Sequence, residues 1–248
     1  MDDIGASTKR FEVYSKRKFG NFLFLKYLNG FKAWGPYREM SVDEWNEVYK
    51  ILHRFKAKLT VGITAAWVKR NGELTPFPEK FPDEASILKD GLHEGLLEIA
   101  NHGLTHCVVG KHLPRLFSSN RQYHREFWES IPREIHFDHL DQSQSILQDY
   151  FETRITTLIP PGNVFSNDTV EAAAKYGIER INYRKWETSS LKEKIKIING
   201  ETIFENNLPL ENVIRFHDKE IVLEGVVWLK DKLEAISRDA EFVFVKEL

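Results

Sequence analysis

The chain has 248 residues, of which 42% are hydrophobic and 29% are charged. This balance is typical of a folded domain and excludes a disordered or collagen-like chain. The formal net charge is −2, so no basic excess is available to neutralise phosphates. We therefore expect neither a general nucleic-acid binder nor a general membrane-surface binder. The single cysteine, Cys107, excludes an intrachain disulfide and a cysteine-rich zinc site.

The first residues, Met1-Asp2-Asp3, are acidic and lack an apolar run, so we expect no signal peptide. No stretch approaches the roughly 18 apolar residues that a membrane helix needs. The last four residues, 245–248, are not an ER-retention signal. These features predict a cytoplasmic protein with no membrane span.

Residues 1–20 are polar and basic and predict a surface lead-in. Residues 22–25 are apolar and predict a buried strand that ends before Asn29-Gly30. Ser41, with Glu44 three residues later, forms the pattern of a capping box and predicts the start of a helix. The apolar residues that share one face of that helix are Val42, Trp45, Val48, Leu52 and Phe55. The next predicted strand covers residues 59–63.

The middle of the chain continues the alternation of helices and strands. After a proline-rich loop, the predicted elements are a helix over 83–93, a strand over 96–100, a long loop over 103–132, a helix over 133–151 and a strand over 155–159. The loop is longer than a connection in a compact domain needs to be, which favours a functional role.

The last part of the chain is similar in organisation. It predicts a helix over 167–176, short strands over 178–181, 195–198 and 213–216, an amphipathic helix over 226–236 and a strand over 242–245. Strands that alternate with helices favour an α/β fold with parallel β/α units, and at this length a barrel. No repeat or linker interrupts the chain, so we predict one domain over 1–248.

Polar and glycine-containing segments follow several predicted strands, where the active sites of β/α barrels lie. They are Asn29, His102 with His106, the segment Pro160-Pro161-Gly162, and His217. The H-x-x-x-H spacing of His102 and His106 allows two imidazoles to bind one metal ion. The pair alone is weak evidence, and its position after an apolar strand strengthens it.

Three segments resemble motifs of the polysaccharide deacetylase family (NodB-homology, carbohydrate esterase family 4). Residues 98–106, which read EIANHGLTH, resemble its second motif, a strand of the type E-I-G-N-H followed by a second histidine. Residues 158–162 are similar to its R-x-P-x-G motif, with Leu158 in place of arginine. Residues 214–218 resemble its last motif, a strand that ends in a histidine.

The resemblance implies a distorted, seven-stranded (β/α) barrel in which two histidines and an aspartate bind a divalent metal ion. It implies zinc as the cofactor, with manganese or cobalt as alternatives, and an N-acetylated sugar or polysaccharide precursor as the substrate. Transferred by position, His102 and His106 would be metal ligands and His217 the general acid. The pathway that the resemblance implies is surface-polysaccharide or lipopolysaccharide biosynthesis, including O-antigen.

The sequence departs from the family where acidic residues are expected. The first motif, T-F-D-D-G, supplies the base and a metal ligand, and we align it with residues 26–30, which read KYLNG. Asn29 would then be a weak, uncharged ligand, and Leu28 cannot accept a proton. The fourth motif, of the type D-x-x-D-W, aligns only loosely with residues 182–186.

Three interpretations stay open. Glu126, in the long loop, could replace the missing base, although a solvated loop charge is the commoner role for such a residue. The domain could instead be inactive and bind carbohydrate or serve as a pathway scaffold. As a third interpretation, Asn29 could complete a weakened metal site. Trp34 and Trp128 lie in predicted loops and are candidates to stack against sugar rings, whereas the sequence does not set the oligomeric state.

Overall fold

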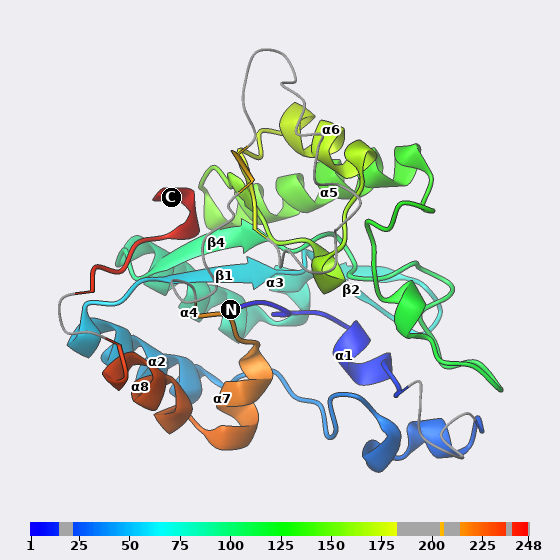
Figure 1. Cartoon of the computed structure of the whole chain (residues 1–248), viewed down its shortest axis with the longest axis horizontal. Helices are drawn as coiled ribbons and strands as arrows, with labels where there is room; N and C mark the ends of the chain where they lie inside the picture. The colour runs from blue at the N-terminus through cyan, green and yellow to red at the C-terminus, as the bar shows by residue number, and fades with distance from the viewer. Residues whose placement is uncertain (15–21, 183–203, 206–213, 237–239, 248) are drawn as a thin grey trace.

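The computed structural model describes residues 1–14, 22–182, 204–205, 214–236 and 240–247. A parallel sheet with the strand order β1-β4-β5-β6-β7 lies at its centre (Figure 1). Its strands are β1 (Leu59–Ile63), β4 (Leu97–Asn101), β5 (Thr157–Leu158), β6 (Arg180–Ile181) and β7 (Phe204–Glu205). A separate antiparallel pair consists of β2 (Ala66–Val68) and β3 (Leu74–Pro76). The α/β prediction with parallel strands is confirmed.

The amino-terminal segment extends the sheet beyond β1. Ile4 forms a parallel bridge with Ile63, and Asp2 forms a parallel bridge with His217. The amide of Gly62 donates to the carbonyl of Met1 at 2.8 Å. Residue 217, residues 2–4 and the five strands therefore lie side by side as seven segments. In the described ranges, no pairing between β7 and residue 217 closes them into a barrel.

Helices cover both faces of the sheet. In Figure 1, α2 and α8 lie below it and α5 and α6 lie above it. The helices are α1 (Thr8–Phe11), α2 (Val42–Phe55), α3 (Phe77–Lys80), α4 (Pro82–His93), α5 (Arg133–Phe151), α6 (Asn167–Lys175), α7 (Asp218–Glu224) and α8 (Val227–Glu234). The 3₁₀ helices are η1 (Leu25–Tyr27), η2 (Asn29–Phe31), η3 (Arg121–Tyr123), η4 (Pro161–Asn163) and η8 (Val245–Glu247). In the part of the chain that the structure describes, no helix has the length and apolar character needed to cross a membrane.

The capping box that begins α2 forms as predicted. The amide of Glu44 donates to the Ser41 hydroxyl, and the Glu44 carboxylate accepts from the Ser41 amide at 2.8 Å. Trp45 and Leu52 on the apolar face of this helix are buried in the main core, together with residues of β1 and β4. The periodicity of the sequence therefore identifies both the helix and the face that it buries.

Most predicted elements are found within one or two residues of their expected bounds. The helices α2, α4, α5, α6 and α8 and the strands β1, β4, β5 and β6 all match a predicted element. The strand predicted over 22–25 is wrong, because this segment forms a turn and the start of η1. Residues 214–216 and 242–245 likewise contain no strand. The strand predicted over 195–198 and residues 183–186 of the fourth motif lie outside the described residues.

The prediction of a surface lead-in is wrong for residues 1–13. Most of them are buried, and Ile4 and Ala6 belong to the interior. Gly5 has a φ of 72°, and a Cβ atom there would lie 2.6 Å from the ring of Phe77. Only glycine fits this close approach, which allows the segment to enter the sheet beside β1.

Candidate metal and catalytic site

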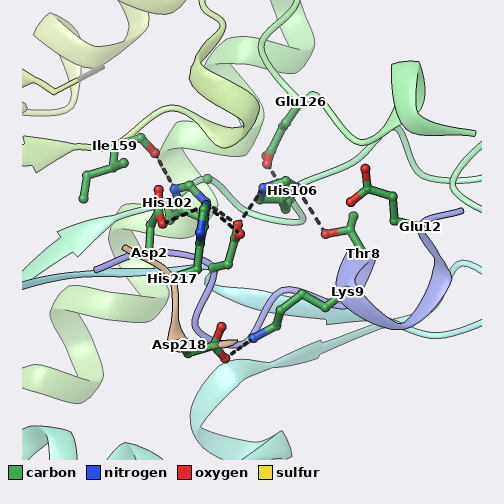
Figure 2. Close-up of polar contacts among 12 residues, drawn as sticks. Asp2, Thr8, Lys9, Glu12, His102, His106, Glu126, Ile159, His217 and Asp218 are labelled. Atoms are coloured by element: carbon green, nitrogen blue, oxygen red, sulfur yellow. Dashed lines mark hydrogen bonds and ion pairs between the residues drawn. The ribbon is translucent and has the colours of Figure 1, made fainter. Parts of the chain in front are cut away.

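Three buried side chains from distant parts of the chain converge at the carboxyl end of the sheet (Figure 2). The Oδ1 atom of Asp3 lies 3.0 Å from Nε2 of His102 and 3.0 Å from Nε2 of His106. The two imidazole rings are 5.0 Å apart between centroids. The structure thus brings together the histidine pair predicted from the sequence and adds a carboxylate to it.

Asp3 reaches the histidines because the segment that carries it lies in the sheet. The parallel bridges of its neighbours, Asp2 and Ile4, fix this segment between His217 and β1. Asp3 itself has a φ of 68°, a left-handed conformation that is uncommon for residues other than glycine. Burial alone would raise the pKa of Asp3, but the interactions with His102 and His106 outweigh it and hold the pKa well below its usual range.

His102 directly follows β4, and its ring is held by a backbone group. Its Nδ1 lies 2.6 Å from the carbonyl oxygen of Ile159. Because a carbonyl oxygen can only accept, Nδ1 carries the proton and donates it. In the neutral ring the lone pair is then on Nε2, the atom that faces Asp3. This arrangement is the one that prepares a histidine to ligate a metal ion.

His106 lies in a tight loop whose amides are bound by one carboxylate. The Glu126 side chain accepts hydrogen bonds from the amides of Leu104, Thr105 and His106 at 2.8, 3.1 and 2.7 Å. His106 has a φ of 56°, so its backbone is left-handed, and its Nδ1 lies 3.2 Å from the Thr8 hydroxyl. These contacts turn the imidazole toward Asp3.

Glu126 lies between this loop and α5. It is fully buried, and its remaining partner is Nδ1 of His139, which donates at 2.6 Å. Burial would raise the pKa of Glu126, but His139 and the loop amides outweigh it and lower the pKa. Among the described residues, both of its carboxylate oxygens accept hydrogen bonds within the protein, so the geometry gives Glu126 a positioning role and does not support a catalytic base.

His217 and Asp2 form a second, adjacent group. Nε2 of His217 lies 3.7 Å from Asp2 and 3.9 Å from Asp3. Burial would lower the pKa of His217, whereas the Glu220 hydrogen bond and the charges of Asp2 and Asp3 outweigh it and raise the pKa to about 9. Figure 2 shows His217, the N-cap residue of α7, beside Asp2. His217 thus lies beside the histidine pair, as the sequence predicts.

The donor set of Asp3, His102 and His106 fits a divalent metal ion. Two ligand atoms of one ion, each about 2.1 Å from it, are about 3.0 Å apart at a right angle and about 3.4 Å apart at a tetrahedral angle. The shared Asp3 oxygen lies at the shorter of these separations from each imidazole nitrogen. A nitrogen lone pair that faces a carboxylate oxygen is repelled by it unless a proton or a cation lies between the two atoms. Nitrogen and oxygen donors in this number suit zinc, manganese or cobalt.

The remaining predicted residues lie at different distances from this centre. Trp34 contacts His217 edge to face, with ring centroids 5.4 Å apart. The segment Pro160-Pro161-Gly162 directly follows Ile159, whose carbonyl holds His102, and leads into η4. Trp128 lies further out and packs against the side chain of Arg125. The structure therefore brings Trp34 and the proline segment to the centre, whereas the role of Trp128 stays a prediction.

The alignment of residues 26–30 with the first motif is wrong. This segment forms two short 3₁₀ helices outside the sheet, and Asn29 is exposed. Asp2 and Asp3 instead lie in the segment that pairs with β1, and Asp3 contacts both histidines. The signal was available as Asp2-Asp3-Ile4-Gly5, two successive aspartates followed by a glycine. It was missed because no apolar run precedes it to indicate a strand.

Comparison with known proteins agrees with this architecture. The Polysaccharide deacetylase family model matches residues 35–181. The chain is similar to a CE4 family pseudoenzyme from Bacillus anthracis, with 14% identity, a TM-score of 0.39, and coverage of 56% of this chain and 38% of that chain. It is similar to a family 4 carbohydrate esterase from Streptomyces lividans in complex with acetate, with 12% identity, a TM-score of 0.38, and coverage of 58% of each chain.

The chain is also similar in fold to a 4-alpha-glucanotransferase from Thermococcus litoralis. The identity is 16%, the TM-score is 0.50, and the match covers 84% of this chain and 37% of that chain. No curated protein matches the sequence. The family model covers more than half of the chain and includes both His102 and His106. The chain therefore belongs to the polysaccharide deacetylase family.

Proposed function

We propose that this protein is a metal-dependent carbohydrate N-deacetylase that hydrolyses an N-acetyl group on a sugar. The observation that carries the proposal is the convergence of Asp3, His102 and His106 on one point, with Asp2 and His217 beside it. The substrate would be an N-acetylated sugar or polysaccharide precursor. Its place in surface-polysaccharide or lipopolysaccharide biosynthesis and a cytoplasmic location stay predictions from the sequence.

Asp3, His102 and His106 would hold a divalent ion, with zinc as the first candidate and manganese or cobalt as alternatives. When bound, such an ion polarises the acetamide carbonyl and lowers the pKa of a water molecule. The protein supplies the preformed ligand geometry, because Ile159 orients His102 and Glu126 holds the loop of His106.

The neighbouring residues would move the protons. Asp2 is partly exposed and lies on the His217 side of the centre, so its carboxylate is placed to take a proton from the attacking water. His217 would donate a proton to the nitrogen of the departing amine. Trp34, which contacts the His217 ring, would limit its rotation and present an apolar face to a sugar.

A binding-only role is the second candidate, and one observation favours it. The family arginine of the R-x-P-x-G motif is replaced by Leu158, whose side chain is fully buried in an apolar cluster with Phe127 and Leu140. No cation can therefore act from this position on Asp2. Such a protein would bind a carbohydrate without releasing acetate.

Acetate release from N-acetylated oligosaccharides, with zinc, manganese or cobalt added separately, tests the proposal. We expect turnover with at least one ion. Asp2→Asn should lower kcat by at least about 100-fold with little change in metal affinity, because Asp2 is outside the ligand set. Asp3→Asn should weaken metal binding by at least about 10-fold, since it removes the charged ligand.

The matched control is His53→Ala, which removes an exposed histidine paired with Glu94 at the surface. It should leave both metal binding and turnover unchanged. If the protein binds carbohydrate but releases no acetate with zinc, with manganese or with cobalt, the result would support the binding-only role. Full turnover in Asp3→Asn would exclude the proposed centre.

A further inference from the structure

Two loops on one side of the molecule expose large apolar side chains. Phe24 and Leu28 in the first loop are 72% and 54% exposed, and Leu116 and Phe117 in the second are 52% and 67% exposed. In Figure 1 both loops lie on the side toward which β1 and β4 point, away from α2 and α8. Apolar side chains that are this exposed and gathered in one place mark an interaction surface.

Direct contacts join the two loops into one surface. The buried ammonium group of Lys26 donates to the backbone carbonyls of Arg115 and Ser118. The rings of Phe22 and Phe117 lie 6.1 Å apart between centroids. A third loop adds Arg70, whose guanidinium lies 5.2 Å from the ring centre of Tyr27. We call residues 22–28, 109–117 and Arg70 the loop surface.

The charge of this region differs from that of the whole chain. No acidic residue occurs between Glu12 and Glu39 or between Glu98 and Glu126, although the net charge of the protein is −2. Among the charged side chains of the loop surface, Arg70, Lys111 and Arg115 are exposed. The loop surface itself therefore carries a net positive charge, although the chain as a whole has no basic excess.

This combination of features favours a lipid membrane over a folded protein partner. Exposed phenylalanine and leucine side chains can enter the boundary between head groups and acyl chains. Lysine and arginine beside them are attracted to anionic head groups. The apolar groups project from loop tips, as Phe24 and Phe117 show by their exposure, so a deformable surface can surround them.

We propose that the loop surface docks this protein peripherally on a membrane that contains anionic phospholipids. The same amino-terminal loop continues to Trp34, which contacts His217. Docking would therefore orient the candidate site relative to the membrane. The proposal rests on the loop surface alone and does not depend on deacetylase activity.

Flotation of the full chain with lipid vesicles tests this inference. We expect binding to mixed phosphatidylcholine–phosphatidylglycerol vesicles, weaker binding to phosphatidylcholine alone, and release as salt increases. Phe24→Asp and Phe117→Asp should each lower the partition coefficient by about tenfold or more, because each removes an aromatic ring that would enter the bilayer. Lys111→Glu should lower binding to the anionic vesicles by about tenfold.

Val227→Asp is the matched control, since Val227 is 55% exposed at the start of α8 and outside the loop surface. It should bind vesicles like the unchanged protein. The proposal is overturned if no vesicle is bound, if the two phenylalanine variants bind normally, or if light scattering shows a dimer that these variants dissociate. Because no turnover is measured, an inactive protein that binds vesicles would support this inference while contradicting the proposed activity.

Discussion

Glu126 accepts hydrogen bonds from three consecutive loop amides and from His139 while fully buried. A carboxylate has enough lone pairs for four donors, whereas an amide side chain offers one acceptor oxygen and two competing donors. The shape of the loop that carries His106 therefore depends on the charge of one buried side chain outside the proposed ligand set.

Glu126→Gln should destabilise the protein by about 2–4 kcal/mol, because it leaves buried amides without an acceptor. It should also weaken metal binding by about 10- to 100-fold, since His106 loses its support. Urea unfolding and a metal titration measure the two effects. Glu129→Gln, at an exposed position nearby, is the control, and equal behaviour of the two variants would contradict the positioning role.

The sequence identifies some site residues better than others. His102, His106 and His217 carry recognisable motifs, and the structure brings them together. The orientation of Glu126 could not be predicted, because a loop sequence does not show which way a side chain points. The place of Asp3 was missed because its segment becomes part of the sheet only through contacts with β1 and residue 217, which are distant in sequence.

At the scale of elements, α2 and α4 meet through a buried polar contact. The indole Nε1 of Trp45 donates to Glu84 at 3.1 Å. The other carboxylate oxygen of Glu84 is buried and, among the described residues, has no hydrogen-bond partner. Burial and the nearby charge of Glu39 raise the pKa of Glu84 well above its usual value, although Trp45 and Lys9 act in the opposite direction. Asp218 adds a further negative charge.

A group whose pKa is raised on folding binds its proton more tightly in the native state than in the unfolded state. Protonated Glu84 therefore stabilises the native state fully at low pH, and this stabilisation is lost as pH rises above the ordinary glutamate pKa of 4.5. Glu84→Gln should become more stable than the unchanged protein by about 1 kcal/mol or more at pH 8, with a smaller difference at pH 5. Urea unfolding at both pH values measures this, and the exposed Glu79→Gln is the control. A difference that is equal at both pH values would contradict the raised pKa.

Elements with a clear period or cap were predictable, and the apolar run over 22–25 was not. A short apolar run is compatible with a buried strand, but the sequence alone does not show whether other residues cover it. Here Phe24 stays exposed, and Lys26, directly after the run, anchors it to the second loop. The strand prediction failed because the exposed loop surface has the same apolar composition as a buried strand.

At the scale of the whole molecule, the two ends of the chain are joined beside the candidate site. The Lys9 ammonium group donates to Asp218 at 2.6 Å and to Glu39 at 2.9 Å, and all three side chains are buried. This contact links α1 to the start of α7, next to His217. Figure 2 shows it directly below the histidines.

Lys9→Met should destabilise the protein by about 3–5 kcal/mol, because two buried carboxylates lose their cation. Adding Asp218→Asn should recover part of that loss, since one of the uncompensated charges disappears. Chemical denaturation measures both variants, and Lys50→Met, which breaks an exposed ion pair with Glu47, should change stability by less than about 1 kcal/mol. The assignment fails if Lys9→Met is as mild as Lys50→Met.

Asp3 and His106 both have left-handed backbone, a strained state that the surrounding contacts maintain. A scaffold already held in that state has little freedom to widen or narrow around an incoming ion. Ionic size and preferred coordination would then decide which metal is retained, ahead of the general order of affinities. The choice among metal ions would then follow from the rigidity of the folded backbone around Asp3 and His106.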